Sequence, residues 1–362
     1  VVTSYDLLRR DEALYEGQEF YACILDEAQA IKNHTTQKYK AVCKVRSRVR
    51  FALTGTPVEN RLGELWSIFS FLMPGYLPPY KSFCSRFEKP IVQEEDQTAV
   101  RRLNQLTGPF ILRRMKADVL KELPPKTENV YRIELEEEQR KLYLAAVVDA
   151  REKLQAAKPE DKMAVFAVLM RLREICCDPR LIADNWEGGS AKLDACAELV
   201  SSAVEGGHRI LLFSQFTSML ELLAKRLDAE GISHFTLQGS TPKPVRAELV
   251  RRFNGGEVSV FLISLRAGGT GLNLTAADIV IHYDPWWNVA AQNQATDRAY
   301  RIGQQNPVQV YKLIAQDTIE EKIVELQQAK QSLADTVTGT ADGAILSMRP
   351  DELLQLLEGS EP

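Results

Sequence analysis

The chain has 362 residues, of which 45% are hydrophobic and 26% are charged. This composition is typical of globular domains and excludes a mostly disordered chain. Lys and Arg number 45 against 49 Asp and Glu, and the net charge of −4 excludes a polybasic coat, although local basic patches can still bind nucleic-acid phosphates. The length predicts two or three domains of roughly 100–200 residues each.

The sequence shows no sign of a membrane segment, a leader peptide or a metal cluster. No apolar run approaches the roughly 18–20 residues of a membrane helix, and the first residues lack the basic and apolar regions of a signal peptide. The six cysteines include no Cys-x-x-Cys pair, so we expect no structural zinc, and their scatter is typical of reduced thiols. We expect no membrane and no metal cluster as partners.

Short apolar runs bounded by turn residues predict strands along the chain. Runs of this length are typical of strands that are buried on both faces of a parallel sheet. We expect these strands over residues 21–25, 50–53, 210–213, 258–263, 279–283 and 308–314.

Helical periodicity fills the intervals between these runs. The spacing of Leu220, Leu223 and Leu227 predicts a helix. A capping box that starts at Ser218 would open this helix, and Gly231 would stop it. Further helices are expected over 64–72, 136–157 and 351–357.

The alternation of strands and helices predicts an α/β fold with a doubly wound parallel sheet. The pattern is clearest over residues 192–325. Residues 63–190 differ, because helical patterns broken by prolines dominate there and strand patterns are few. We therefore expect helical insertions and a linker in that stretch, and not a third sheet.

An acidic turn follows the first predicted strand. Asp26 and Glu27 come directly after the apolar run, and Gln29 follows two residues later. Carboxylates at the carboxyl end of a parallel strand can hold Mg²⁺ and orient an attacking water. A solvated acidic turn is the alternative, and this motif alone does not decide between them.

Two more turns follow predicted strands. Thr54, Gly55 and Thr56 form one that is rich in hydroxyls, and an ordinary turn is the favoured interpretation of it alone. The other spans 264–273 and contains three glycines, which let a backbone approach a phosphate closely. A flexible loop is the alternative.

Arg298 and Arg301 stand three residues apart, which would place them on one face of a helix. Two guanidinium groups on one face can reach a γ-phosphate as arginine fingers. A solvated basic face is the alternative, and it is favoured for this pair alone. Nearby, at least one of Trp286 and Trp287 is expected to pack in the core, and base stacking is open to the other.

These motifs occur together in one order, and together they resemble the Swi/Snf-type ATPases of helicase superfamily two. The most specific string is Asp297-Arg298-Ala299-Tyr300-Arg301-Ile302-Gly303-Gln304. The other matching strings lie at 3–8, 26–33, 53–60, 111–116, 123–126, 172–179, 213–216, 237–241 and 264–273. The resemblance covers roughly residues 1–325.

The resemblance implies two RecA-like lobes, each a doubly wound parallel sheet, with helical insertions and with ATP bound in the cleft between the lobes. Residues 1–125 would be the C-terminal part of an incomplete lobe one, with an insertion at about 63–108. Residues 126–190 would be a helical insertion opening lobe two, followed by lobe two at 191–325 and a tail at 326–362. The implied activity is ATP hydrolysis coupled to movement along double-stranded DNA.

The resemblance also implies roles for individual residues. Asp26 and Glu27 match the Mg²⁺-binding and water-activating acids, and Arg298 and Arg301 match the arginine fingers. Thr54, Gly55 and Thr56 match a coupling turn. The residues that would bind ATP are Gln29, Gly269, Gly271, Arg298 and Arg301. Those that would contact DNA are Thr3, Ser214, Gln238, Gly239, Ser240, Thr241, Ala267 and Gly268.

Two features depart from the family pattern. Gln29 stands where the family usually has His, and its amide can still form hydrogen bonds. More importantly, no Gly-x-x-x-x-Gly-Lys-Ser/Thr motif occurs in the 362 residues. This P-loop cradles the phosphates and supplies a lysine. In the family it precedes the point where this chain begins, so we expect a longer gene product and no ATP hydrolysis by this chain alone.

Two other functions remain open on the sequence. One is a nucleic-acid-binding module without catalysis, and the other is an RNA-directed ATPase, since a fold alone does not fix the substrate. The sequence does not identify the remodelled target, for which DNA-bound proteins such as polymerase are candidates. Without a basic nuclear-signal run the chain resembles bacterial members, which implies a cytoplasmic, nucleoid-associated protein, or a nuclear one if eukaryotic.

Overall fold

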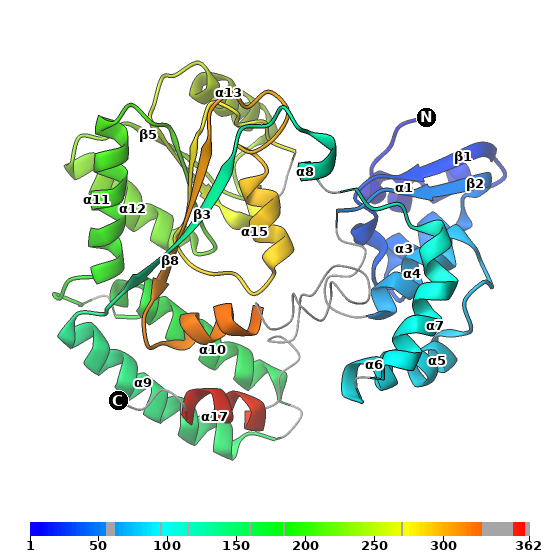
Figure 1. Ribbon diagram of the computed structural model, residues 1–362, viewed down its shortest axis with the longest axis horizontal. Coiled ribbons are helices and arrows are strands. Elements are labelled where there is room, and N and C mark those ends of the chain that lie inside the picture. The colour runs from blue at the N-terminus through cyan, green and yellow to red at the C-terminus, as the bar shows by residue number, and fades with distance from the viewer. Residues whose placement is uncertain are drawn as a thin grey trace. The chain divides into compact units, whose positions relative to one another are not determined.

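The computed structural model divides into two compact units, which are described separately. Residues 1–114 form unit 1, and residues 115–326 together with the last helix form unit 2 (Figure 1). The structure describes residues 1–55, 62–94, 96–114, 116–158, 161–183, 185–268, 271–327 and 350–358.

Unit 1 is built on a two-stranded parallel sheet. Strand β1 (Glu19–Leu25) pairs with β2 (Arg46–Ala52), with Glu19 opposite Arg46 and Leu25 opposite Ala52. Helices α1 (Tyr5–Arg10), α2 (Glu12–Tyr15) and α3 (Gln37–Lys44) complete this part. The core under the sheet contains Leu8, Leu25, Ala28, Ile31, Val42, Val45 and Phe71.

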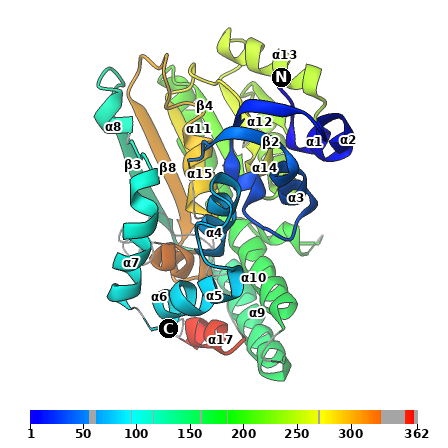
Figure 2. The same cartoon turned by 90° about the vertical axis from the view of Figure 1, so that its right-hand side faces the viewer.

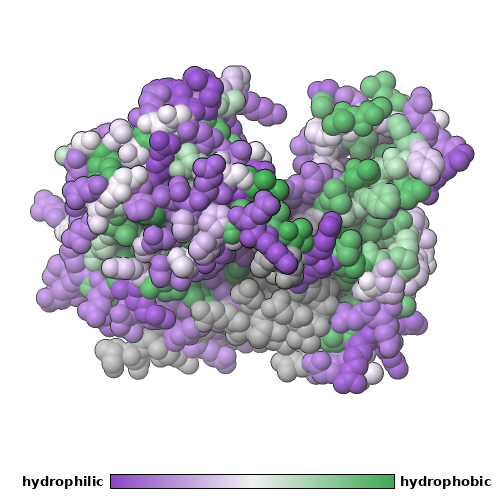
Figure 3. All heavy atoms as spheres, turned by 45° about the horizontal axis from the view of Figure 1, so that its top comes forward, coloured by the Kyte–Doolittle hydropathy of each residue, from purple (hydrophilic) through white to green (hydrophobic). Residues whose placement is uncertain are grey.

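The other side of this small sheet is exposed, which corrects the prediction that both of its strands are buried on both faces. On that side Ile24 is 61% exposed, and Phe51, which lies opposite it in the register, is 52% exposed. Hydrophobic side chains accordingly gather on the surface of unit 1 in Figure 3. An apolar run therefore predicted these strands correctly but not how much of each side chain is covered.

The rest of unit 1 is helical. Its helices are α4 (Leu62–Leu72), α5 (Tyr80–Phe83), a π-helical turn at Cys84–Glu88, α6 (Lys89–Gln93) and α7 (Gln97–Thr107). They share a core of Leu62, Leu65, Phe69, Leu77, Phe83, Phe87 and Leu103. The helix predicted at 64–72 is thereby confirmed.

Unit 2 contains a six-stranded, wholly parallel sheet with the strand order β3-β8-β7-β4-β6-β5. The strands are β3 (Lys126–Ile133), β4 (Ile210–Ser214), β5 (His234–Leu237), β6 (Val260–Ser264), β7 (Ile279–His282) and β8 (Val308–Ala315). The predicted α/β class is confirmed, and β4, β6 and β7 are buried throughout.

Helices cover both faces of this sheet (Figures 1 and 2). One face packs against α11 (Ala191–Glu205) and α12 (Thr217–Ala229). The other packs against α13 (Lys243–Asn254), α14 (Leu265–Gly268) and α15 (Val289–Thr296). Each face thus buries apolar area, the main favourable contribution to folding.

A helical layer lies beside the sheet. It consists of α9 (Glu137–Ala156), α10 (Lys162–Cys177), a helix at 319–327 and α17 (Pro350–Glu358). Leu154, Leu169 and Leu353 are among its core residues. A short helix outside this layer, α8 (Lys116–Val119), precedes β3. Among the described helices, none is both long and apolar enough to span a bilayer.

Local capping explains where several helices begin. A side-chain oxygen ahead of each of these helices accepts a hydrogen bond from a backbone N–H of the first turn, which has no partner within the helix. The capping residues are Ser4, Thr36, Asp96, Asp161, Ser190 and Asn288. The predicted capping box at Ser218 is wrong, because α12 begins one residue earlier and no side chain caps it. The predicted stop is confirmed by Gly231, whose φ is +70°.

Two strands of unit 2 were not predicted. Strand β3 lies at the edge of the sheet and all but its last residue are exposed, so its sequence is mostly polar. Its presence corrects the expectation that residues 126–190 are only helices and linker. Strand β5 lies at the opposite edge and has four residues, too few for a clear pattern.

Candidate functional site

Asp26 and Glu27 form an exposed acidic turn directly after β1. The backbone of Glu27 is left-handed, with φ 50°, and its N–H donates to Asp26 Oδ1 at 2.9 Å. A non-glycine residue in this region carries a conformational cost, so the turn is held in a strained shape. A short 3₁₀ helix, Ala28–Ile31, begins directly after Glu27, and both acidic residues are exposed to solvent.

A hydrogen-bonded relay connects this turn to the end of β2. Gln29 Nε2 donates to Glu27 Oε2 at 2.5 Å, and Thr54 Oγ1 donates to Gln29 Oε1 at 2.7 Å. The two strands end side by side, which brings these residues together despite 25 positions of separation. Of the predicted coupling residues, Gly55 is exposed, and Thr56 lies outside the described residues.

Tyr5 supports the acidic turn and was given no role from the sequence. Its hydroxyl donates to the backbone oxygen of Asp26 at 2.7 Å. Burial, together with the nearby Asp26, Cys23 and Glu27, raises the pKa of Tyr5 to about 12. The hydroxyl therefore stays protonated and available as a donor. Only its place in the string at 3–8 could have drawn attention to it.

The arginine turn of unit 2, residues 297–301, follows α15. That helix ends at Thr296, so Arg298 and Arg301 lie in turns, and the prediction that they share a helix face is wrong. Arg298 Nε donates to the oxygen of Gly268 at 2.9 Å, and Arg301 Nη1 donates to that of Leu272 at 3.1 Å. Both guanidinium groups are thus fixed against the glycine loop, which is the turn predicted at 264–273.

The glycine loop itself begins as a short helix, α14, at the carboxyl end of β6. A Cβ on Gly268 would lie 2.8 Å from Phe213 Cε1, so only glycine fits there without movement. Gly271 has φ +45°, a backbone region that favours glycine. Gly269 falls outside the described residues.

The predicted DNA-contacting turn at 238–241 is held by an arginine that the sequence did not suggest. Arg246 Nη2 donates to the oxygens of Gln238 and Gly239 at 3.3 and 3.1 Å, and its Nε donates to that of Thr241 at 3.2 Å. Gly239 and Ser240 remain exposed. Arg246 lies on α13, so the helix fixes the turn.

The other predicted DNA contacts differ in exposure. Thr3 is exposed, whereas Ser214, Ala267 and Gly268 are buried. The Ser214 hydroxyl donates to Asp284 Oδ1 at 2.6 Å. Its side chain is therefore engaged inside unit 2, and a DNA contact at this position would fall to neighbouring backbone groups.

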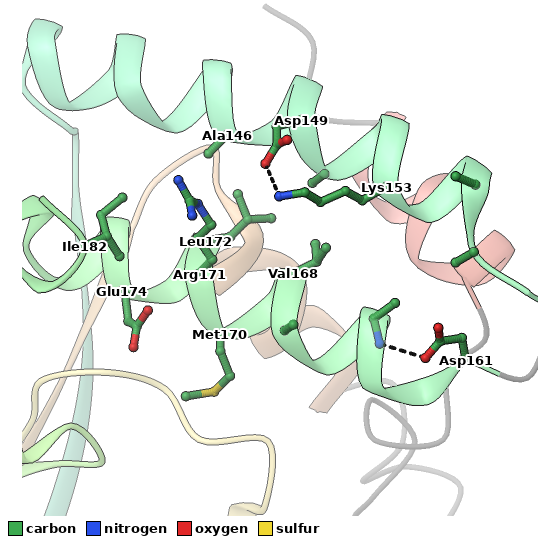
Figure 4. A pocket seen from close by; sticks show the side chains of 15 residues that line it. Ala146, Asp149, Lys153, Asp161, Val168, Met170, Arg171, Leu172, Glu174 and Ile182 are labelled. Atoms are coloured by element: carbon green, nitrogen blue, oxygen red, sulfur yellow. Dashed lines mark hydrogen bonds and ion pairs between the residues drawn. The ribbon is translucent and has the colours of Figure 1, made fainter.

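A separate hollow lies in the helical layer of unit 2, between α9 and α10 (Figure 4). Alanines form much of its lining, and Asp149 and Lys153 of α9 form an ion pair of 2.7 Å in it. None of the described candidate site residues lines this hollow. It is therefore distinct from the acidic turn and from the arginine turn.

Comparison with known proteins covers both units. Residues 1–181 match the SNF2-related domain family, and residues 191–303 match the helicase conserved C-terminal domain. The chain is 39% identical over 363 residues to an uncharacterised ATP-dependent helicase of Mycoplasma pneumoniae. It is 40% identical over 365 residues to a putative ATP-dependent helicase/translocase of Bacillus subtilis.

These matches cover 99% and 98% of this chain, but 34% and 40% of the two relatives. Among solved structures, the SWI2/SNF2 ATPase core of Sulfolobus solfataricus in complex with double-stranded DNA is 34% identical, with a TM-score of 0.55. That match covers 96% of this chain and 75% of the other. The core domain in a second structure is 36% identical, with a TM-score of 0.56, covering 98% and 74%.

Proposed function

The chain belongs to the SNF2-related ATPase family, and from that premise we propose that it carries acid, arginine and DNA-binding elements of a double-stranded DNA translocase. The activity is ATP hydrolysis coupled to movement along DNA. The observation that carries the proposal is the relay from Glu27 through Gln29 to Thr54, which ties a water-activating acid to the turn after β2. The bacterial relatives support a cytoplasmic, nucleoid-associated protein.

Asp26 and Glu27 fit a magnesium nucleotide as substrate. Mg²⁺ in nucleotide sites is commonly held by one or two carboxylates together with substrate phosphates and water. Both carboxylates are exposed at a strand end, as such binding needs. Bound there, Mg²⁺ would neutralise phosphate charge. Asp26 would hold it, and Glu27 would orient the attacking water, with its side chain positioned by Gln29.

Arg298 and Arg301 would offset the negative charge that the phosphoryl group carries in the transition state. Their hydrogen bonds to Gly268 and Leu272 fix the guanidinium groups before substrate binds. Lys116 forms an ion pair of 2.5 Å with Asp297, which further fixes this turn. Preorganisation of this kind reduces the cost of reaching the reactive geometry.

DNA would be contacted by the turn at 238–241, by Thr3 and by backbone groups around Ser214 and Ala267–Gly268. Thr3, Gly239 and Ser240 are exposed, and hydroxyl and backbone N–H groups suit contacts to phosphates, which position a protein on DNA but do not read its sequence. We therefore expect sequence-independent binding that weakens as salt rises.

Replacing Glu27 by Gln in the full-length protein tests this proposal. Loss of a general base typically lowers turnover by about 10²–10⁴-fold, and we expect at least a hundredfold loss of DNA-stimulated ATP turnover. DNA affinity, measured by fluorescence anisotropy, should not change. Glu19→Gln, at the exposed other end of β1, is the matched control and should retain full turnover. Normal turnover in Glu27→Gln would remove Glu27 from the chemistry.

The 362-residue chain contains no P-loop motif, and we propose that it does not hydrolyse ATP by itself. DNA-stimulated turnover by the purified chain, abolished by Glu27→Gln, would refute this part of the proposal while supporting the assigned role of Glu27.

A further inference from the structure

Arg173 of α10 is completely buried, and the proposed chemistry leaves it unexplained. Its Nη2 donates to Asp284 Oδ2 at 3.2 Å and to the oxygen of Pro285 at 2.6 Å. Asp284 and Pro285 follow β7 directly. The arginine therefore fastens the helical layer to the carboxyl end of the sheet.

Aromatic rings surround the guanidinium group of Arg173. Its Cζ lies 4.7 Å from the ring centroid of Trp287, 5.5 Å from that of Phe216 and 5.6 Å from that of Trp286. Its Nε and Nη1 have no hydrogen-bond partner among the described residues. A buried charge with unpaired donors is costly, and apolar replacements of buried ion pairs are often neutral or stabilising. Stability alone therefore does not account for an arginine at this position.

Asp284 connects Arg173 to the turn at 214–216, which follows β4. Asp284 Oδ1 accepts from Ser214 Oγ at 2.6 Å and from the N–H of Gln215 at 3.2 Å. Ser214 Oγ in turn accepts from the N–H of Phe216 at 3.1 Å. The N–H of Gln215 also donates to Asp284 Oδ2 at 3.4 Å, the oxygen that accepts from Arg173, so one carboxylate holds both the turn and the arginine.

We propose that Arg173 is a positioning residue for DNA binding, which acts through Asp284 on the turn at 214–216. This inference rests on the proposed function, in which backbone groups around Ser214 contact DNA. Arg173 orients the carboxylate. The carboxylate holds the N–H of Gln215 directly and that of Phe216 through Ser214 Oγ, and so fixes the shape of the turn. The bond to Pro285 at the same time fixes the start of the segment that carries Trp286 and Trp287.

Unit 2 offers a matched control for this role. Lys192 and Glu320 form another ion pair in which both side chains are fully buried. Glu320 also accepts from the N–H of Ala315 and from Cys177 Sγ. In the part of the chain that the structure describes, the hydrogen bonds of this pair do not reach the turn at 214–216. Breaking it should therefore cost stability without displacing that turn.

The test compares Arg173→Met with Lys192→Met in the full-length protein. The readouts are the concentration of double-stranded DNA that half-saturates ATP turnover, turnover at saturating DNA, and turnover without DNA. We expect Arg173→Met to raise the half-saturating concentration about tenfold, as for one lost hydrogen bond to a charged group, and to change the two turnover rates less than about twofold. Lys192→Met should leave the half-saturating concentration unchanged.

A double-mutant cycle tests the path through Asp284. Asp284→Asn should raise the half-saturating concentration, and adding Arg173→Met should raise it no further. Near-ultraviolet circular dichroism adds a direct signature, because the rings of Trp286 and Trp287 lie 4.3 Å apart beside Arg173. Their signal should change in Arg173→Met and persist in Lys192→Met. If Arg173→Met does not fold, Arg173→Lys and Asp284→Asn provide the same comparison, and Arg173→Lys should restore part of the affinity.

Each outcome is decisive. Equal increases of the half-saturating DNA concentration in Arg173→Met and Lys192→Met would overturn the positioning role while leaving the proposed function standing. Additive effects of Arg173→Met and Asp284→Asn would do the same. A wild-type protein that double-stranded DNA does not stimulate would overturn both.

Discussion

His282 should make unit 2 sensitive to acid. It ends β7 and is only 2% exposed. Its Nε2 lies 2.9 Å from Thr296 Oγ1, at the end of α15, and its ring stacks on Phe213 with centroids 5.6 Å apart. This contact joins the sheet to the helix that precedes the arginine turn. Protonation of His282 would place a charge in an apolar site and disrupt the contact with Thr296.

Burial, helped by the nearby charges of Lys312 and Lys126 and opposed by that of Glu128, lowers the pKa of His282 from 6.5 to about 3. The folded state therefore keeps the ring neutral while the unfolded state gains a proton as the pH falls below 6.5. The stabilisation is complete above pH 6.5 and is lost toward pH 3. One pH unit corresponds to 1.36 kcal/mol, so the free energy of unfolding should fall by about 2 kcal/mol between pH 6.5 and pH 5.

Denaturant unfolding at pH 7 and pH 5 measures this loss. In the 362-residue chain carrying Trp66→Phe, the remaining tryptophans all lie in unit 2 and report on its unfolding. His282→Gln keeps a hydrogen-bonding group near Thr296 but cannot titrate, so the difference between the two pH values should shrink by about 2 kcal/mol. Thr296→Val should lower the free energy of unfolding by about 1 kcal/mol at both pH values and leave the difference between the two pH values unchanged. A difference in His282→Gln equal to that of the wild type would refute the reasoning.

Three further variants test the candidate site. Gln29→Ala removes the amide that orients Glu27, so DNA-stimulated ATP turnover should fall about tenfold with DNA affinity unchanged, and normal turnover would show that the relay is dispensable. Arg301→Ala should remove most ATP turnover and spare DNA binding; lost DNA binding would indicate a structural role. Tyr5→Phe should lower the free energy of unfolding of unit 1 by about 1 kcal/mol in urea titrations, and an unchanged value would contradict the bond to Asp26.

The strands that could be predicted from the sequence are those whose burial requires a recognisable run of apolar residues. Strands β4, β6 and β7 are buried on both faces and so appear as continuous apolar runs. Edge strands carry no such run, which is why β3 and β5 were missed. The exposed side of the small sheet in unit 1 was missed for a different reason, since periodicity does not report what covers a strand.

The candidate site shows the same limit. Asp26 and Glu27 could be singled out because they follow an apolar run. The spacing of Arg298 and Arg301 suggested a helix, but α15 ends at Thr296, and the N–H of Leu274 then bonds to the oxygen of Arg298 at 3.0 Å. That bond comes from tertiary structure, which a helical pattern does not contain.

The residues that support the site were the hardest to find. Arg246 donates to backbone oxygens of the turn at 238–241. Every residue type carries such an oxygen, so the sequence does not reveal these partners. Arg173 and Asp284 are 111 positions apart. Their pairing follows from packing a helical layer against the end of a sheet, and no local motif indicates it.

The most direct test of the proposed translocase activity is ATP turnover by the full-length protein without nucleic acid and with double-stranded DNA, single-stranded DNA or RNA. We expect strong stimulation by double-stranded DNA, lost in Glu27→Gln. Stimulation by RNA alone, or no turnover under any of these conditions, would contradict it.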